Sequence, residues 1–307
     1  MRAVRAVRVA VAAAVAALGL AVAVSAGGAS ARPAWPVTVK AANGAVTIPA
    51  RPTAIMSLSA TATEMLYAIG AGSQVKAVDK YSNYPPGTPM TSLDGYSVSA
   101  EAIAKYHPDL IIVAYLPPSL ASQLATLHIP VLYDPAAPSL AVAYHQYLGL
   151  GLATGHLAGA RAEVARLKAR VAAIVKATPR VPAGTTYYYE LDPTYYSVTS
   201  ATFMGQLLGL LGLHSIADAV GANSNGGYPQ LTAEFILQAD PQYIFLADHG
   251  CCQATPATVA ARPGWSALSA VSAHRVFILP DSIASRWGPR ITILLQAVST
   301  DLRRTLG

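Results

Sequence analysis

Two glutamates, Glu101 and Glu234, occupy matching places in a template that this 307-residue sequence uses twice, over residues 98–114 and 231–247. In each copy a hydroxyl residue that can cap a helix precedes the glutamate. A proline and an apolar run typical of a buried parallel strand follow it. Either carboxylate alone could simply compensate a helix dipole, and that interpretation stays open. The repetition favours two similar lobes, each presenting one acid to a symmetric partner.

The chain has two cysteines, Cys251 and Cys252, and they are adjacent. In an oxidising compartment such a pair either closes a vicinal disulfide or remains as two thiols. A disulfide would form a rigid apolar surface that suits packing on a planar ligand, and a purely structural kink is the alternative. A thiol-dependent enzyme or redox protein, using one cysteine with His249, is also left open. We predict no metal site, because neighbouring cysteines cannot supply a four-ligand cage.

Arg286, Trp287 and Arg290 follow the last predicted strand, residues 275–280. They therefore fall at the edge where open α/β sheets bind ligands. Arg286 could pair with an anionic ligand group through a bidentate contact, and Trp287 could line the same wall. For Arg290, a structural role at the start of the final helix, 290–306, is an equal alternative.

The elements that must position these residues are alternating strands and helices, which predict parallel sheets with right-handed crossovers. The predicted fold class is α/β, with two Rossmann-like lobes at residues 38–138 and 185–307. Residues 139–178 between them predict two helices. The second, 157–177, is about 30 Å long at 1.5 Å per residue, which is enough for one long helix to bridge both lobes.

Two helix starts can be predicted from local motifs. Thr61 to Glu64 has the pattern of a capping box, and Ser200 is placed to cap a helix over 201–211. Residues 32–39, with two prolines, read as a short lead-in to the first lobe.

Residues 1–31 have the features of a signal peptide: Arg2, Arg5 and Arg8, then an apolar stretch, then a small-residue cleavage site ending at Ala31. No cysteine lies near that site, so we predict an exported protein without a lipid anchor. Removing those arginines from the 21 basic residues leaves 18 against 15 acidic ones. Such a weak positive charge does not predict nucleic-acid binding.

From Pro52 onward the chain resembles the periplasmic substrate-binding proteins of ABC importers for iron complexes and vitamin B12. The resemblance rests on the order of several short motifs: Ser57-Leu58-Ser59 with Thr63-Glu64, Tyr81-Ser82-Asn83-Tyr84-Pro85-Pro86, Pro108-Asp109-Leu110-Ile111, Tyr228-Pro229-Gln230 with Glu234, Pro263-Gly264-Trp265, and Pro289-Arg290-Ile291. It implies two lobes bridged by one long helix and a ligand held between them. It also implies that Glu101 and Glu234 dock onto arginines of two permease subunits.

By the same resemblance, Tyr81, Tyr96, Tyr196 and Tyr228 fall at or beside aromatic ligand contacts, with Tyr96 one residue out of register with a tryptophan of that family. Aromatic rings suit the flat faces of a macrocycle, and a tyrosine phenolate could ligate ferric iron. The predicted function is an exported solute-binding protein that delivers a metal chelate, namely a corrinoid, ferric siderophore or haem, to an ABC permease. Corrinoids come first because tyrosines outnumber the cations expected in the cleft. We expect a monomer without a resident cofactor, and a sensory protein that meets no transporter remains an alternative.

Overall fold

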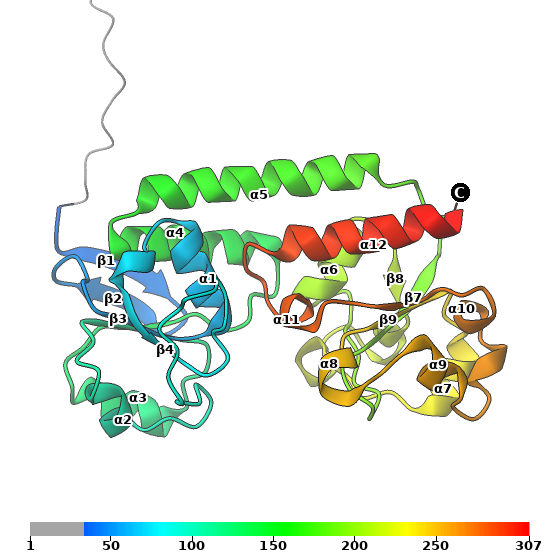
Figure 1. Cartoon of the computed structure of the whole chain (residues 1–307), viewed down its shortest axis with the longest axis horizontal. Helices are drawn as coiled ribbons and strands as arrows, with labels where there is room; N and C mark the ends of the chain where they lie inside the picture. Colours follow the sequence, from blue (N-terminus) through cyan, green and yellow to red (C-terminus); the bar gives the residue numbers. More distant parts are fainter. Residues whose placement is uncertain (1–33, 307) are drawn as a thin grey trace, which may run out of the picture. The chain divides into compact units, whose positions relative to one another are not determined.

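The computed structural model describes residues 34–306. The predicted signal peptide and its cleavage after Ala31 lie outside the described residues. Two four-stranded parallel sheets form the centres of two lobes (Figure 1). The strands of the first lobe are β3 (Ile55–Leu58), β4 (Val75–Val78), β5 (Leu110–Val113) and β6 (Val131–Tyr133). Those of the second lobe are β7 (Thr186–Glu190), β8 (His214–Ser215), β9 (Tyr243–Leu246) and β10 (Val276–Ile278).

The two sheets have the same topology. The strand order is β4-β3-β5-β6 in the first lobe and β8-β7-β9-β10 in the second. In each lobe the first strand in sequence lies between the second and the third, and the fourth lies outside the third. The template strands of the sequence repeat, β5 and β9, are therefore equivalent, and the predicted pair of similar α/β lobes is confirmed.

Burial explains why the template strands are continuous apolar runs. Every residue of β5 is fully buried, as a strand covered on both faces of a parallel sheet must be. β9 is also buried throughout. Helices of the first lobe are α1 (Ala60–Ala68), α2 (Ala100–Ala104) and α3 (Pro118–Ala125). Helices of the second lobe are α6 (Phe203–Gly209), α7 (Ala233–Ala239), α8 (His249–Cys252), α9 (Pro256–Ala260), α10 (Ser269–Ser272) and α11 (Asp281–Ala284).

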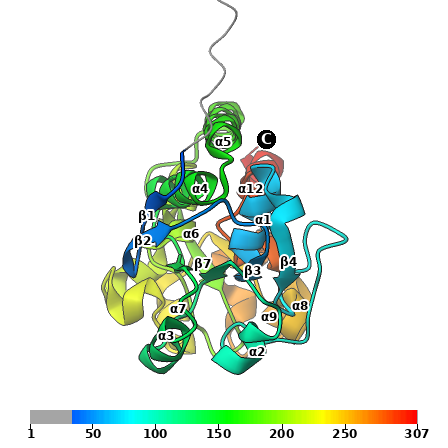
Figure 2. The ribbon, with the colours of Figure 1, turned by 90° about the vertical axis from the view of Figure 1, so that its left-hand side faces the viewer.

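Three longer helices, α4 (Leu140–Thr154), α5 (Leu157–Ala177) and α12 (Ile291–Leu306), lie together on one side of both lobes (Figures 1 and 2). α5 has the bounds that the sequence predicted. It packs against α4 and α1 near the first lobe and against α12 near the second. Its buried residues recur at helical spacing, as in Ala160, Val164, Leu167, Val171 and Ile174, so one apolar stripe holds the bridging helix along its length.

Two predicted helix starts are wrong. α1 begins earlier than the capping-box pattern suggested, because the Ser59 side chain accepts the Ala62 N–H and serves as N-cap. Glu64 does not cap the helix; it lies within α1, and its side chain is buried. α6 begins later than expected, with Thr202 rather than Ser200 as its N-cap.

The predicted lead-in at residues 32–39 is also partly wrong. The antiparallel strands β1 (Val37–Ala41) and β2 (Gly44–Ile48) form a hairpin. Gly44 takes the positive φ of 105° that the tight turn requires. The Asn43 side chain bonds the backbone of Val131 and Tyr133, so the hairpin is attached to the edge strand β6.

Within residues 34–306, no helix is both long enough and apolar enough to cross a membrane.

Candidate functional site

Three exposed tyrosines line the first lobe beyond the ends of its strands. Tyr81 and Tyr96 lie in the loop after β4, and Tyr115 follows β5. Tyr96 is 65% exposed, and its ring centre lies 5.9 Å from that of Tyr81 and 6.0 Å from that of Tyr115. We call these three residues the tyrosine wall. Their rings touch one another while a large part of each stays open to solvent, which is the form of an aromatic binding surface.

Asp94 holds the tyrosine wall in place. Its carboxylate accepts hydrogen bonds from the Tyr81 hydroxyl at 3.1 Å and from the Tyr96 N–H at 2.9 Å. It also forms an ion pair with Lys80 at 2.9 Å, and the Lys80 ammonium lies 5.0 Å from the Tyr81 ring centre. The hydrogen bond from Lys80 is the main reason that the pKa of Asp94 is lowered. The charge of Lys80 is therefore already balanced beside the wall.

Gly95 lets this loop approach the sheet. A Cβ at this position would lie 2.6 Å from the Asp79 carboxylate and 2.9 Å from the Leu58 carbonyl oxygen. Only glycine fits so close to the carboxyl end of β3, and Tyr96 follows directly. Burial raises the pKa of Asp79 despite the hydrogen bond at 2.6 Å that its carboxylate accepts from Ser82.

In the second lobe Tyr196 and Tyr228 lie on two segments that run side by side. Tyr196 forms an antiparallel bridge with Gln230, and the Ser197 N–H donates to the Pro229 carbonyl at 3.0 Å. Tyr228 is 37% exposed, whereas Tyr196 is half-buried. Burial raises the pKa of the Tyr228 phenol.

Arg286, Trp287 and Arg290 lie at the boundary between the lobes. Both arginines pair with the buried Glu64 of α1, at 2.8 Å and 2.5 Å respectively. Arg286 also donates to the Tyr81 carbonyl at 2.8 Å, and so joins the C-terminal segment to the loop of the tyrosine wall. The Trp287 indole donates to Gln146 of α4 at 2.6 Å. We call Glu64, Arg286 and Arg290 the inter-lobe clamp.

A second buried ionic cluster lies within the second lobe. Glu190, the last residue of β7, receives two hydrogen bonds from Arg262, at 2.5 and 2.6 Å. Asp248, just after β9, is fully buried, and within the described residues neither of its carboxylate oxygens has a hydrogen-bond donor. Burial first, and then the neighbouring Glu190, raises the pKa of Asp248 to about 7.

The two cysteines form the end of α8. Their sulfurs are joined as a disulfide, and both residues are exposed. The imidazole Nδ1 of His249, on the same helix, lies 2.8 Å from the Ala254 carbonyl oxygen. Within the described residues no group of three or more His, Cys, Asp or Glu side chains is arranged to hold a metal ion.

Glu101 and Glu234 have the placement that the sequence repeat predicted. Each lies in the first turn of its helix, α2 or α7, and is exposed. The predicted caps are present: Ser99 accepts the Ala102 N–H, and Thr232 accepts the Phe235 N–H. Hydrogen bonds with its own backbone N–H and with Ser99 lower the pKa of Glu101. Both helices lie at the end of their lobe away from α5 (Figures 1 and 2).

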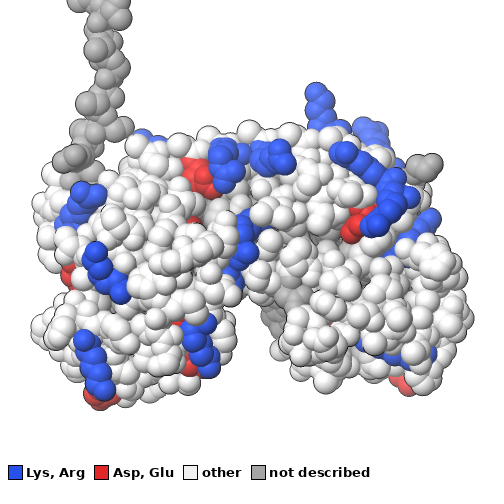
Figure 3. Space-filling view, in the orientation of Figure 1, with Lys and Arg blue, Asp and Glu red and all other residues white. Residues whose placement is uncertain are grey.

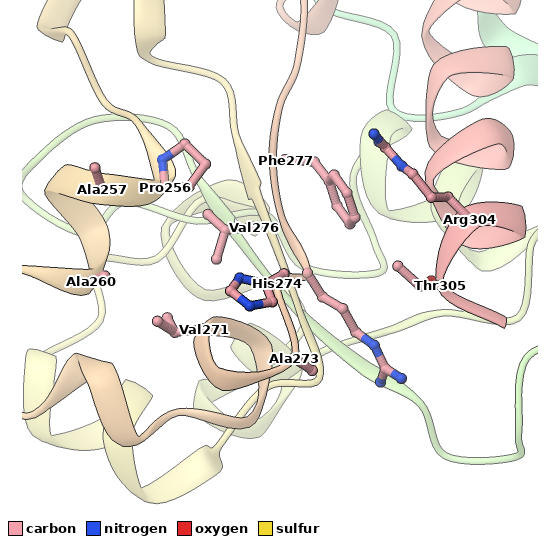
Figure 4. Close-up of a pocket in the computed structure, with 11 residues that line it drawn as sticks. Pro256, Ala257, Ala260, Val271, Ala273, His274, Val276, Phe277, Arg304 and Thr305 are labelled. Atoms are coloured by element: carbon pink, nitrogen blue, oxygen red, sulfur yellow. The ribbon is translucent and has the colours of Figure 1, made fainter.

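Figure 3 shows a notch between the lobes, on the side away from α5. Elsewhere, a cavity of about 810 Å³ follows the edge strand β10 beside the end of α12 (Figure 4). It is lined by His274, Arg275, Val276, Phe277, Arg304 and neighbouring residues, and by no residue predicted to bind ligand. We assign no ligand to it.

Sequence reasoning missed two residues of this region. Tyr115 follows a buried parallel strand directly, and the preference of open α/β sheets for ligands at that edge could have identified it. Glu64 was misread as a capping residue. Its pairing with Arg286 and Arg290 joins positions more than 200 residues apart, so no local spacing signals it.

The model of the periplasmic binding protein family matches residues 55–283. An uncharacterised ABC transporter substrate-binding lipoprotein of Bacillus subtilis is 28% identical, over 84% of this chain and 82% of that protein. A cobalamin-binding protein of Halobacterium salinarum is 30% identical, over 68% of this chain and 58% of its own length. The crystal structure of the periplasmic vitamin B12-binding protein of Vibrio cholerae has a TM-score of 0.67 at 25% identity, over 83% of this chain and 98% of that one.

The chain therefore belongs to the periplasmic binding protein family. It is a substrate-binding protein of the class that serves ABC transporters, and not an enzyme. The family and the fold class predicted from the sequence are confirmed, and the thiol-dependent enzyme is excluded.

Proposed function

We propose that this protein captures a corrinoid between its lobes outside the cytoplasm and delivers it to an ABC permease. The observation that carries the proposal is the tyrosine wall of Tyr81, Tyr96 and Tyr115, with its exposed rings in mutual contact. Flat aromatic faces cover a planar macrocycle at a low cost in side-chain entropy. The names of the cobalamin-binding and vitamin B12-binding relatives support the same ligand class.

The charge closest to the wall is balanced, which supports a corrinoid over an anionic chelate. Lys80 is paired with Asp94, whereas Arg286 and Arg290, both mostly buried, share the single carboxylate of Glu64. Haem carries propionates and many ferric siderophores carry net negative charge, so both would gain most from an unpaired cation. A corrinoid has a periphery of neutral amides, and a site binds it through hydrogen bonds and apolar contacts rather than through a cation. In this proposal Arg286 therefore supports the Tyr81 loop, and Trp287 is held by its hydrogen bond to Gln146 of α4.

Delivery through Glu101 and Glu234 is supported by their equivalent positions in the two lobes. Both are exposed first-turn acids on helices that lie at the same end of their lobes. A permease built from two like subunits can offer each of them the same cationic partner. Tyr196 and Tyr228 would contact the ligand from the second lobe, and the vicinal disulfide would lie beside them.

A panel of chelates tests the proposal. Cyanocobalamin, haem and several ferric siderophores are added to the protein whose N-terminus is Arg32, and thermal unfolding is followed. A ligand at 100 times its dissociation constant should add about 2.7 kcal/mol to the free energy of unfolding. We expect cyanocobalamin to give the largest shift. A larger shift with haem or a siderophore would make that chelate, rather than a corrinoid, the ligand. No shift with any chelate would refute the proposal.

An uptake assay separates a transport receptor from a sensor. Cells that carry the protein with its permease should accumulate corrinoid, and deletion of this chain should stop accumulation at low external concentration. Accumulation that is unaffected by the deletion, in cells whose protein binds corrinoid, would favour the sensory role. Sequencing the exported protein would test the cleavage predicted after Ala31.

A further inference from the structure

The disulfide of Cys251 and Cys252 does not serve global stability. A disulfide stabilises a fold by closing a loop of the unfolded chain, and the stabilisation is smaller when that loop is shorter. Here the two cysteines are one residue apart in sequence, so no loop is closed. Both residues are exposed at the end of the four-residue helix α8. An exposed disulfide without a structural task is available for thiol–disulfide exchange.

Because of the internal duplication, α8 follows β9 in the second lobe much as Tyr115 of the tyrosine wall follows β5 in the first. In the first lobe Ala114 follows the template strand β5, and Tyr115 comes next. In the second lobe Ala247 follows β9, and Asp248 and α8 come next. The equivalence of β5 and β9 in the two sheets makes these exits equivalent. Figure 1 shows α8 on the side of the second lobe that faces the first.

The turn that carries the cysteines is held by contacts that do not depend on the disulfide. The Cys252 N–H donates to the Asp248 carbonyl at 2.9 Å, and the Gln253 N–H donates to the His249 carbonyl at 2.9 Å. The Asp248 side chain is fully buried, and His249 is fixed through Ala254. Breaking the sulfur–sulfur bond would therefore free two thiols while the turn keeps its place.

We propose that Cys251–Cys252 is a two-electron redox switch in the ligand site, whose reduced form gives a thiolate to the metal of a bound chelate with an exchangeable axial position. This inference rests on the proposed function and deepens it. The disulfide form has no thiolate to give and binds the chelate through apolar contact alone. The reduced form selects chelates with a water-bound metal over those whose axial position is blocked. Thiolate is a soft ligand that suits cobalt and iron in such complexes.

The chemistry balances with a dithiol as reductant. Exchange breaks the Cys251–Cys252 bond, transfers two electrons and two protons to the cysteines, and leaves the reductant as its own disulfide. One cysteine thiol then loses its proton to water and displaces the axial water of the chelated metal. A metal–sulfur bond forms, a metal–oxygen bond breaks, and the metal keeps its oxidation state.

Two corrinoids that differ only at the upper axial position test the switch. Aquacobalamin has an exchangeable water there, whereas the cyanide of cyanocobalamin blocks it. Protein is reduced with dithiothreitol, desalted without oxygen and titrated, and the oxidised protein is titrated in parallel. We expect the reduced protein to bind aquacobalamin at least tenfold more tightly and to change its visible spectrum. Cyanocobalamin should bind equally to both forms.

The control is the double variant Cys251→Ser, Cys252→Ser, which removes every thiol of the chain. Its affinity for aquacobalamin and its visible spectrum should be the same with and without reductant treatment. Haemin, whose iron also has exchangeable axial positions, is titrated in the same way. Thiol counts and thermal unfolding confirm that the reduced protein is both reduced and folded.

The outcomes separate this inference from the proposed function. If oxidised protein binds a chelate and reduction changes neither affinity nor spectrum, the switch is wrong and the receptor function stands. A spectral change that persists in the double serine variant also overturns the switch. If no chelate binds in either state, the switch and the proposed function are both wrong.

Discussion

The two lobes share one topology but have different chemistry at the ends of their strands. After β4 and β5, the first lobe has exposed tyrosines whose supporting charges are paired at the surface. After β7 and β9, the second lobe has a buried cluster of Glu190, Asp248 and Arg262 beneath an exposed disulfide. The exposed first-turn acids Glu101 and Glu234 are repeated in both lobes. Under the proposed function, the duplication preserves the surface that faces a symmetric partner, whereas the surface that faces an asymmetric ligand has diverged.

Reversing both docking acids should have the largest effect. In the Glu101→Lys, Glu234→Lys variant we expect uptake to fall to background while ligand affinity stays unchanged, because both side chains are exposed. Stability should fall slightly, because each change puts a cation at the N-terminus of a helix. Each single reversal should reduce uptake to a similar extent if the two lobes dock equivalently. Transport by cells and ligand binding by purified protein are the two measurements.

The matched control for docking places lysines at exposed helix positions in the same part of each lobe, away from Glu101 and Glu234. Ala125→Lys on α3 with Gln238→Lys on α7 adds two positive charges to the same end of the lobes, against the four-charge change of the double reversal. Near-normal uptake in this control would assign the loss to the two acids. Normal uptake in the Glu101→Lys, Glu234→Lys variant would remove the docking assignment.

Disruption of the inter-lobe clamp should give the next largest effect. Glu64→Gln leaves Arg286 and Arg290, both mostly buried, without their counter-charge. Removing one partner from a buried ion pair costs about 3–5 kcal/mol. The comparison is Glu190→Gln, which leaves Arg262 unpaired within one lobe. Chemical denaturation of both variants gives the two free energies.

The two clamp variants should differ in ligand affinity. Only Glu64→Gln loosens the contact of Arg286 with the Tyr81 loop, so it should weaken ligand binding more than Glu190→Gln does. Equal losses of affinity would show that the inter-lobe clamp does not support the tyrosine wall.

Much of this fold follows from local patterns. The bridging helix was predicted at its observed bounds because its apolar stripe and charged face are both continuous. The first-turn positions of Glu101 and Glu234 were predicted from capping residues, a proline and a buried strand, all of which are short-range signals. The capping-box pattern at Thr61 failed because the burial of Glu64 is decided by arginines more than 200 positions away, at Arg286 and Arg290. The hairpin was missed although Asn43-Gly44 is a common turn pair.

The candidate site could be predicted only in part. Tyr81 and Tyr96 were named through family resemblance, but the contact of Tyr96 with Tyr115 joins segments that follow different strands. Arg286 follows the last strand of its sheet, as the sequence indicated. Its pairing with Glu64 depends on how the two lobes pack, which no local pattern encodes.

A smaller effect concerns the pH dependence of stability in the second lobe. The Asp248 carboxyl holds its proton more tightly in the folded state, with a pKa of about 7, than at its ordinary 3.8. Its contribution is therefore complete below about pH 4 and is lost as the pH rises through about 7. We expect Asp248→Asn to match wild type in acid and to be the more stable protein near pH 8.

The corresponding change in the first lobe is Asp134→Asn, at the end of β6, where burial raises the pKa to about 6. Its stability difference from wild type should begin at the same pH, about 4, and level off about one pH unit lower, with a smaller total. Thermal unfolding across this range, read as variant minus wild type, gives both curves. A flat difference for Asp248→Asn would show that this carboxyl is ionised in the folded protein.

The most direct test is an equilibrium titration of cyanocobalamin into the oxidised wild-type protein and into the Tyr81→Ala, Tyr96→Ala, Tyr115→Ala variant. Tyr106→Ala is the control, because Tyr106 is similarly exposed but lies outside the wall. We predict one-to-one binding by wild type and the control. The triple variant should bind roughly a hundredfold or more weakly, at about 1 kcal/mol per lost ring. Wild-type protein that binds no corrinoid, or a triple variant that binds as wild type does, would contradict the account.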